Sequence, residues 1–96
     1  MRWWRRLRGR RAPVASEVPV QQLAADLRRL SAHFEQVDRS DAPAKAFRLR
    51  AVSLAYDDVL LVAARTLDVP APERPPLASI ERLQTEAALA QHGFDW

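Results

Sequence analysis

The stretch Val20 to Val37 (VQQLAADLRRLSAHFEQV) decides the fold class, because its apolar residues recur at alternating spacings of three and four. These residues are Val20, Leu23, Leu27, Leu30, Phe34 and Val37. Such spacing places them in one narrow stripe along a helix, as in a helix that packs in a bundle. The stretch is too short for a long coiled coil, so we interpret it as one helix of an intramolecular bundle.

Prolines divide the remainder of the chain into two more segments. Pro43 follows the first segment, and four prolines between Pro70 and Pro76 precede the last. Glycine occurs only twice, and no stretch alternates between apolar and polar residues in the manner of a strand. The sequence therefore predicts an all-α fold, a small three-helix bundle over residues 17–96 with helices at about 19–38, 43–68 and 77–92. A basic N-terminal arm, residues 1–16, precedes it.

The second predicted helix is apolar on two sides. One stripe is expected to face the core and contains Leu49, Val52, Tyr56, Val59, Leu60, Ala63 and Leu67. The opposite stripe contains Phe47, Ala51, Leu54, Leu61 and Val62, with Asp58 and Arg65 among them. A simple bundle would leave this second stripe in water, and exposed apolar patches usually mark interfaces. We therefore predict that it binds a partner helix or a second copy of the chain, unless the other helices, the arm or the C-terminal tail cover it.

The third predicted helix has a single apolar stripe. Its members are Leu77, Ile80, Leu83, Ala87 and Ala90, which we expect to face the core, and Arg82 and Glu86 have the spacing of a charge pair along the helix. Gly93 is placed to end the helix in a left-handed turn, with Phe94 supplying the apolar contact of a Schellman motif. Trp96 is interpreted as a lid on the core or, alternatively, as a docking residue.

The arm concentrates the positive charge of the chain. Its first eleven residues (MRWWRRLRGRR) hold six of the fifteen basic residues and no acid, so the net charge of +3 divides into +6 here and −3 elsewhere. This distribution predicts an anionic partner. The residues expected to bind it are Arg2, Trp3, Trp4, Arg5, Arg6, Leu7, Arg8, Arg10 and Arg11.

Two anionic partners fit the arm. In a short helix Trp3, Trp4 and Leu7 would share one side, which suits insertion at a membrane surface with arginines near the headgroups. Arginines could instead neutralise nucleic-acid phosphates while tryptophans stack on bases. The paired tryptophans, and an acidic remainder with no second basic surface, favour the membrane. An arm without function is the third possibility.

Catalytic and metal-binding patterns are missing from the sequence. There is no cysteine, and the two histidines, His33 and His92, are not at ligand spacing, so we expect neither a metal nor a cofactor. Asp57 and Asp58 are adjacent and diverge on a helix, and Ser53 has no base implied nearby. No apolar segment is long enough to span a bilayer. We therefore expect a non-enzymatic interaction module in the cytoplasm, peripheral to the membrane, with no small-molecule substrate.

Overall fold

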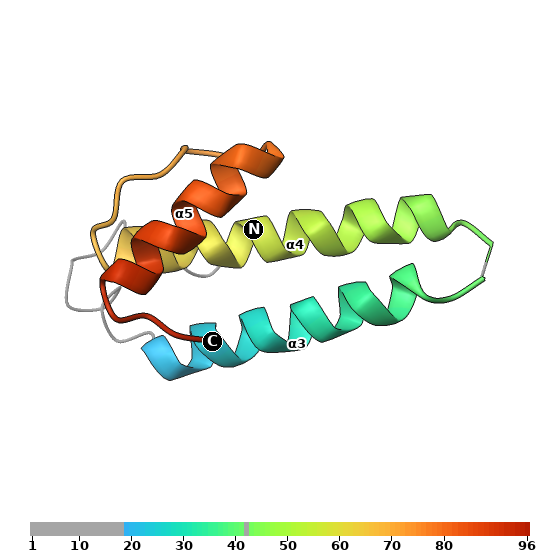
Figure 1. Ribbon diagram of the computed structural model, residues 1–96, viewed down its shortest axis with the longest axis horizontal. Coiled ribbons are helices and arrows are strands. Elements are labelled where there is room, and N and C mark those ends of the chain that lie inside the picture. The colour runs from blue at the N-terminus through green and yellow to red at the C-terminus, as the bar shows by residue number, and fades with distance from the viewer. Residues whose placement is uncertain (1–18, 42) are drawn as a thin grey trace, which may run out of the picture.

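The computed structural model describes residues 19–41 and 43–96, and the arm with all its predicted binding residues lies outside this part. The described chain contains three helices, α3 (Val20–Asp38), α4 (Lys45–Thr66) and α5 (Ser79–Gln91), and no strand (Figure 1). The predicted all-α fold with three helices is confirmed, and each helix falls inside its predicted range. Among these helices none is long and apolar enough to cross a membrane.

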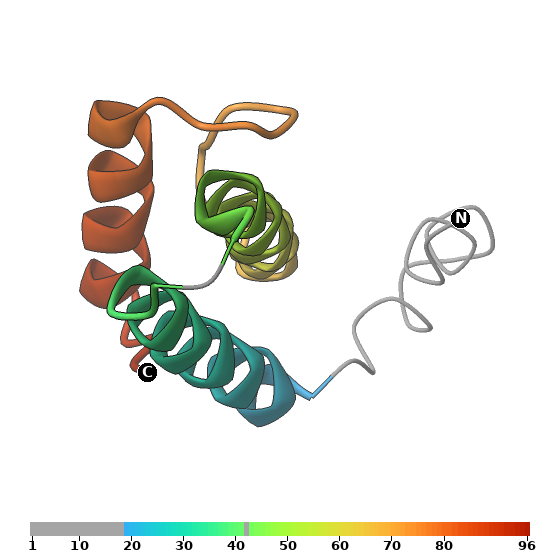
Figure 2. The same cartoon turned by 90° about the vertical axis from the view of Figure 1, so that its right-hand side faces the viewer.

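The helices are arranged as a hairpin crossed by a shorter helix. α3 and α4 lie side by side and run in opposite directions (Figure 1). α5 runs obliquely across α4 near the end of the hairpin that holds the C-terminus of α4 (Figure 1), and Figure 2 shows α5 to one side of the hairpin. The other end of the hairpin, where α3 ends and α4 begins, extends beyond α5. Half of α4 therefore has α3 as its only helical neighbour.

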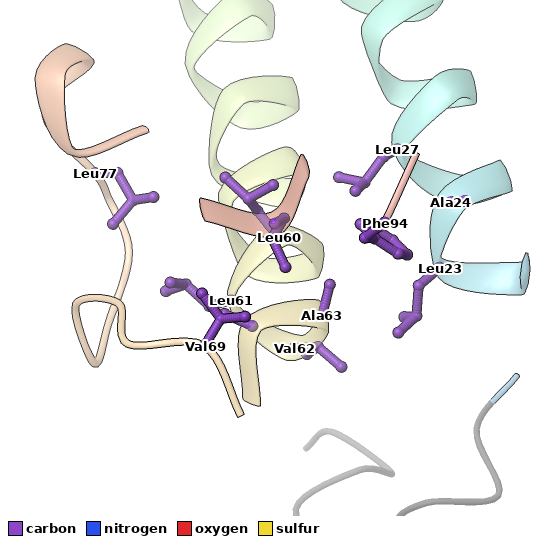
Figure 3. Packing of buried hydrophobic residues seen from close by; sticks show 12 residues of the cluster. Leu23, Ala24, Leu27, Leu60, Leu61, Val62, Ala63, Val69, Leu77 and Phe94 are labelled. Atoms are coloured by element: carbon purple, nitrogen blue, oxygen red, sulfur yellow. The ribbon is translucent and has the colours of Figure 1, made fainter. Parts of the chain in front are cut away.

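The core lies where all three helices meet. Leu23 and Leu27 of α3 pack with Leu60 of α4, and Phe94 from the C-terminal tail lies beside the two α3 residues (Figure 3). Residues 60–64 of α4 are all buried, which means that its whole circumference is covered at this level. In the predicted stripe of the first helix, Leu23, Leu27, Leu30 and Val37 are buried, Phe34 is half-buried and Val20 is exposed.

Two helices end in the same kind of turn. Gly93 adopts φ +83°, and the amides of Gly93 and Phe94 donate to the carbonyls of Ala90 and Leu89, both at 3.0 Å. This is the Schellman motif predicted for the end of the third helix, and it directs Phe94 into the core. α4 ends similarly at Asp68, with φ 58°, and the amide of Val69 donates to Ala64 O at 2.7 Å.

Candidate functional site

A buried ion pair joins α4 to the start of α5. The Asp57 side chain is fully enclosed, with an exposed fraction of 0%. Its Oδ1 accepts a hydrogen bond from Arg82 Nε at 2.6 Å, and its Oδ2 accepts from Arg82 Nη2 at 2.8 Å and from the Leu77 amide at 3.0 Å. Arg82 Nη2 also donates to Leu77 O at 3.2 Å. The pair therefore fixes both where α5 begins and which side of α5 faces α4.

A second polar cluster joins α4, α5 and the tail. Tyr56 Oη donates to Glu86 Oε2 at 2.5 Å and accepts from Trp96 Nε1 at 3.2 Å. The Trp96 ring lies 5.2 Å from that of Phe94, centroid to centroid. Burial, followed by the hydrogen bond to Glu86, raises the pKa of Tyr56 above its usual value. Trp96 thus packs against the core as a lid, the first of its two predicted roles.

A groove of about 280 Å³ opens beside this cluster. It lies between the helices and is lined by Leu30, Ser31, Phe34, Glu35, Ser53, Tyr56, Arg82 and Glu86. The lining includes Leu30 and Phe34 together with Tyr56 and Glu86, which hydrogen-bond each other, and it contains no histidine. Across residues 19–41 and 43–96, no three His, Cys, Asp or Glu side chains are grouped so that they could hold a metal ion.

The second apolar stripe of α4 divides into an exposed half and a buried half. Phe47 is 65% exposed and Leu54 47%, and Ala51 between them is also exposed. We call these three residues the outer face of α4. Leu61 is only 2% exposed, however, and Val62 is also buried.

The prediction that the whole stripe lies in water is therefore wrong for its C-terminal half. Leu61 packs in the core cluster, where Val69 from the connector between α4 and α5 lies beside it (Figure 3). Two further members of the predicted interface, Asp58 and Arg65, are half-buried and exposed, respectively. The connector covers the stripe at this end, and it does not reach the outer face.

Positive charge flanks the outer face of α4. The segment Lys45–Tyr56 contains Lys45, Arg48 and Arg50 and no acid. At about 100° per residue, Arg48 and Arg50 lie on opposite sides of the outer face, and both are exposed. Within the described residues, no ion pair involves any of these three cations. The expectation that the acidic part of the chain has no second basic surface stays a prediction, and these three cations are the residues that bear on it.

The predicted core stripe of the third helix faces largely outward. Ile80 is 60% exposed and Leu83 62%, and Ala87 and Ala90 are exposed as well. We call these four residues the outer face of α5. Leu77, the one member of the predicted stripe that precedes α5, is buried as predicted, and the buried residues within α5 are Thr85 and Leu89. Because Arg82 turns toward Asp57, the side of α5 that carries Arg82 and Thr85 meets α4, and the predicted stripe turns away.

Negative charge borders the outer face of α5. A shallow hollow of about 330 Å³ is lined by Glu86, Ala90, Phe94, Asp95 and Trp96, so two carboxylates lie beside the C-terminal end of this face. Arg82, the one basic residue of α5, is bound to Asp57. The predicted ion pair of Arg82 with Glu86 is thus replaced by one with Asp57, and Glu86 is hydrogen-bonded to Tyr56.

Sequence reasoning missed the Asp57–Arg82 pair, although a signal was present. Asp57 lies on the same side of α4 as Leu60 and Ala64, both of which are apolar. A carboxylate on a buried side needs a cation, and Arg82 is the only arginine or lysine in the third predicted helix. Comparison of the chain with protein-family models, with curated proteins and with solved structures gave no match.

Proposed function

We propose that this chain is a non-enzymatic helical interaction module that its arm holds on an anionic surface, the cytoplasmic face of a membrane. The observation that carries this proposal is the division of charge, +6 in the first eleven residues and −3 in the rest. Each arginine near an anionic leaflet contributes roughly 1 kcal/mol, so six contribute several kcal/mol before the cost of ordering. Trp3, Trp4 and Leu7 add apolar contact with the headgroup region.

In this proposal the helical body presents a protein-binding surface. The outer face of α4 leaves two large apolar side chains, Phe47 and Leu54, more exposed than is usual for such residues. Within the groove Tyr56 donates to Glu86 and Arg82 is bound to Asp57, so these groups hold the helices together. Cytoplasmic location, peripheral attachment and the absence of a cofactor belong to the same proposal.

Binding of the full chain to vesicles and nucleic acids tests the role of the arm. The test variant replaces the six arm arginines, Arg2, Arg5, Arg6, Arg8, Arg10 and Arg11, with glutamine. A control outside the arm replaces the three cations of α4, Lys45, Arg48 and Arg50, in the same way. Each protein is titrated with anionic vesicles, neutral vesicles, duplex DNA and single-stranded RNA at two salt concentrations.

The arm variant should bind anionic vesicles at least about a hundredfold more weakly than the unmodified chain, because several kcal/mol are lost and 1.4 kcal/mol corresponds to a factor of ten. The control should lose much less. Equal vesicle binding by the unmodified chain and the arm variant would contradict the proposal.

Nucleic acid is the second candidate partner, and the basic flanks of α4 are the specific observation that favours it. Lys45, Arg48 and Arg50 give the body a cationic surface of its own, to which phosphates could bind together with the arm. In that case the control variant also loses affinity for nucleic acid, and the affinity of the unmodified chain falls log-linearly with salt.

A further inference from the structure

Two exposed apolar faces with opposite charge at their borders occur on this one chain. The outer face of α4 (Phe47, Ala51, Leu54) is flanked by Arg48 and Arg50. The outer face of α5 (Ile80, Leu83, Ala87, Ala90) borders the hollow that Glu86 and Asp95 line. We propose that the chain associates with itself head to tail, the outer face of α4 in one copy packing on the outer face of α5 in the next.

Charge selects this pairing over the symmetric ones. If α4 packed on α4 of a second copy, Arg48 and Arg50 would meet the same cations, and like charges across an interface are unfavourable. If α5 packed on α5, no arginine or lysine of α5 would face the carboxylates of Glu86 and Asp95, because Arg82 is bound to Asp57. The α4 to α5 contact brings Arg48 and Arg50 toward the exposed Asp95 and the half-buried Glu86 while both apolar faces lose contact with water.

The outer faces of α4 and α5 cannot pack against each other within a single copy. α5 covers α4 through the side that carries Arg82 and Thr85, and its outer face points away from that contact. The contact must therefore form between copies. A contact between two different surfaces is heterologous, so it repeats until a ring closes or an open chain forms.

The side chains at both faces are suited to such a contact. Phe47, Leu54, Ile80 and Leu83 are each about half or more exposed, and they are the large anchors. Ala51, Ala87 and Ala90 are small and would let the two helices approach closely. This inference rests on the partner surface proposed above for α4, and it names the partner as a second copy.

Complementation between two blocked variants of the full chain tests the proposal. Leu54→Asp blocks the outer face of α4, and Leu83→Asp blocks that of α5. Because both side chains are exposed, neither change disturbs the core, and circular dichroism checks this. Gln36→Asp, on an exposed position of α3, is the matched control for the added charge.

Sedimentation velocity over a wide range of concentration provides the readout. The unmodified chain and the control should form species larger than a dimer as concentration rises, and each blocked variant alone should remain monomeric. An equimolar mixture of the two should form a one-to-one dimer and nothing larger, because one intact face of each kind remains. The inference is overturned if the unmodified chain stays monomeric, if Leu83→Asp associates like the control, or if the mixture does not associate.

Cross-linking gives a second measurement, because the chain has no cysteine of its own. Leu54→Cys and Leu83→Cys should form a mixed disulfide under mild oxidation, in preference to either symmetric one. Preferential α4 to α4 cross-linking would overturn the inference. These outcomes are independent of the vesicle assay, so failure of self-association can be distinguished from failure of the arm.

Discussion

Removal of Arg82 should destabilise the protein more than a substitution at any exposed residue, because it leaves the buried Asp57 carboxylate without its cation. In Arg82→Met, Asp57 stays at 0% exposure and keeps one of its three hydrogen bonds, that from the Leu77 amide. Breaking a buried ion pair by removing one partner costs about 3–5 kcal/mol. A domain of this size has a total stability of roughly 4–12 kcal/mol, so a substantial part of it would be lost.

Asp57→Asn should lower the free energy of unfolding less than Arg82→Met does. The asparagine oxygen still accepts one hydrogen bond, no charge is left enclosed, and Arg82, with 28% of its side chain exposed, can reach water. The double variant Asp57→Leu with Arg82→Met should be more stable than Arg82→Met alone, because two apolar side chains then replace the unpaired buried carboxylate. Arg50→Met, an exposed cation, is the control and should change stability by at most about 0.5 kcal/mol.

Urea unfolding at neutral pH, followed by far-ultraviolet circular dichroism, measures these differences. Together with Asp57→Leu alone, the double variant completes a double-mutant cycle, which isolates the interaction between the two side chains from their separate effects. A loss below about 1 kcal/mol for Arg82→Met, or simple additivity in the cycle, would refute the claim that a buried ion pair fixes α5 on α4.

Further predictions concern the tail and the tyrosine cluster. Folding raises the pKa of Tyr56, the only tyrosine of the chain. The protonated hydroxyl therefore stabilises the folded state fully below about pH 10, the pKa of a tyrosine in the unfolded chain. This stabilisation is lost as the pH rises toward the higher pKa of the folded state. Absorbance titration near 295 nm should show that Tyr56 ionises only when the protein unfolds. Tyr56→Phe should remove this loss of stability at alkaline pH. Ionisation of Tyr56 in the folded protein at the ordinary tyrosine pKa would argue against its hydrogen bond to Glu86. Gly93→Ala should cost about 1–2 kcal/mol in urea unfolding, since φ is +83° and nothing lies within 4 Å of an added Cβ; no loss would mean that the Schellman turn is not required. Phe94→Ala should cost about 3–5 kcal/mol by the same measurement, as expected for a core aromatic, and a surface-like loss would contradict its place in the core.

Periodicity predicted the helices better than it predicted their faces. The alternating spacing in α3 identified Leu23, Leu27, Leu30 and Val37 correctly, because α3 packs along its length mainly against α4. The same reasoning failed for α5. There a stripe of apolar residues competes with a buried ion pair, because a buried Asp57 carboxylate without its cation is unfavourable by several kcal/mol. Arg82 therefore turns toward Asp57, and Ile80 and Leu83 are left exposed.

The second stripe of α4 was detected from the sequence, but its extent was not. Whether an apolar residue on this side is buried depends on how far the connector and α5 reach along the helix. They cover Leu61 and Val62 and leave Phe47 and Leu54 exposed. Contacts between segments that are distant in the sequence cannot be predicted from the residues of α4 alone. The sequence also did not show that Arg48 and Arg50 border one exposed apolar face while Glu86 and Asp95 border another, because this depends on how the helices pack.

The most direct test of the proposed attachment is the tryptophan emission of Trp96→Phe, in which Trp3 and Trp4 are the only remaining tryptophans. On addition of anionic vesicles the emission should shift to shorter wavelength, as both indoles enter the headgroup region, and neutral vesicles should have much less effect. Unchanged emission at vesicle concentrations that bind the protein would contradict insertion of the arm and, with it, the proposed membrane attachment.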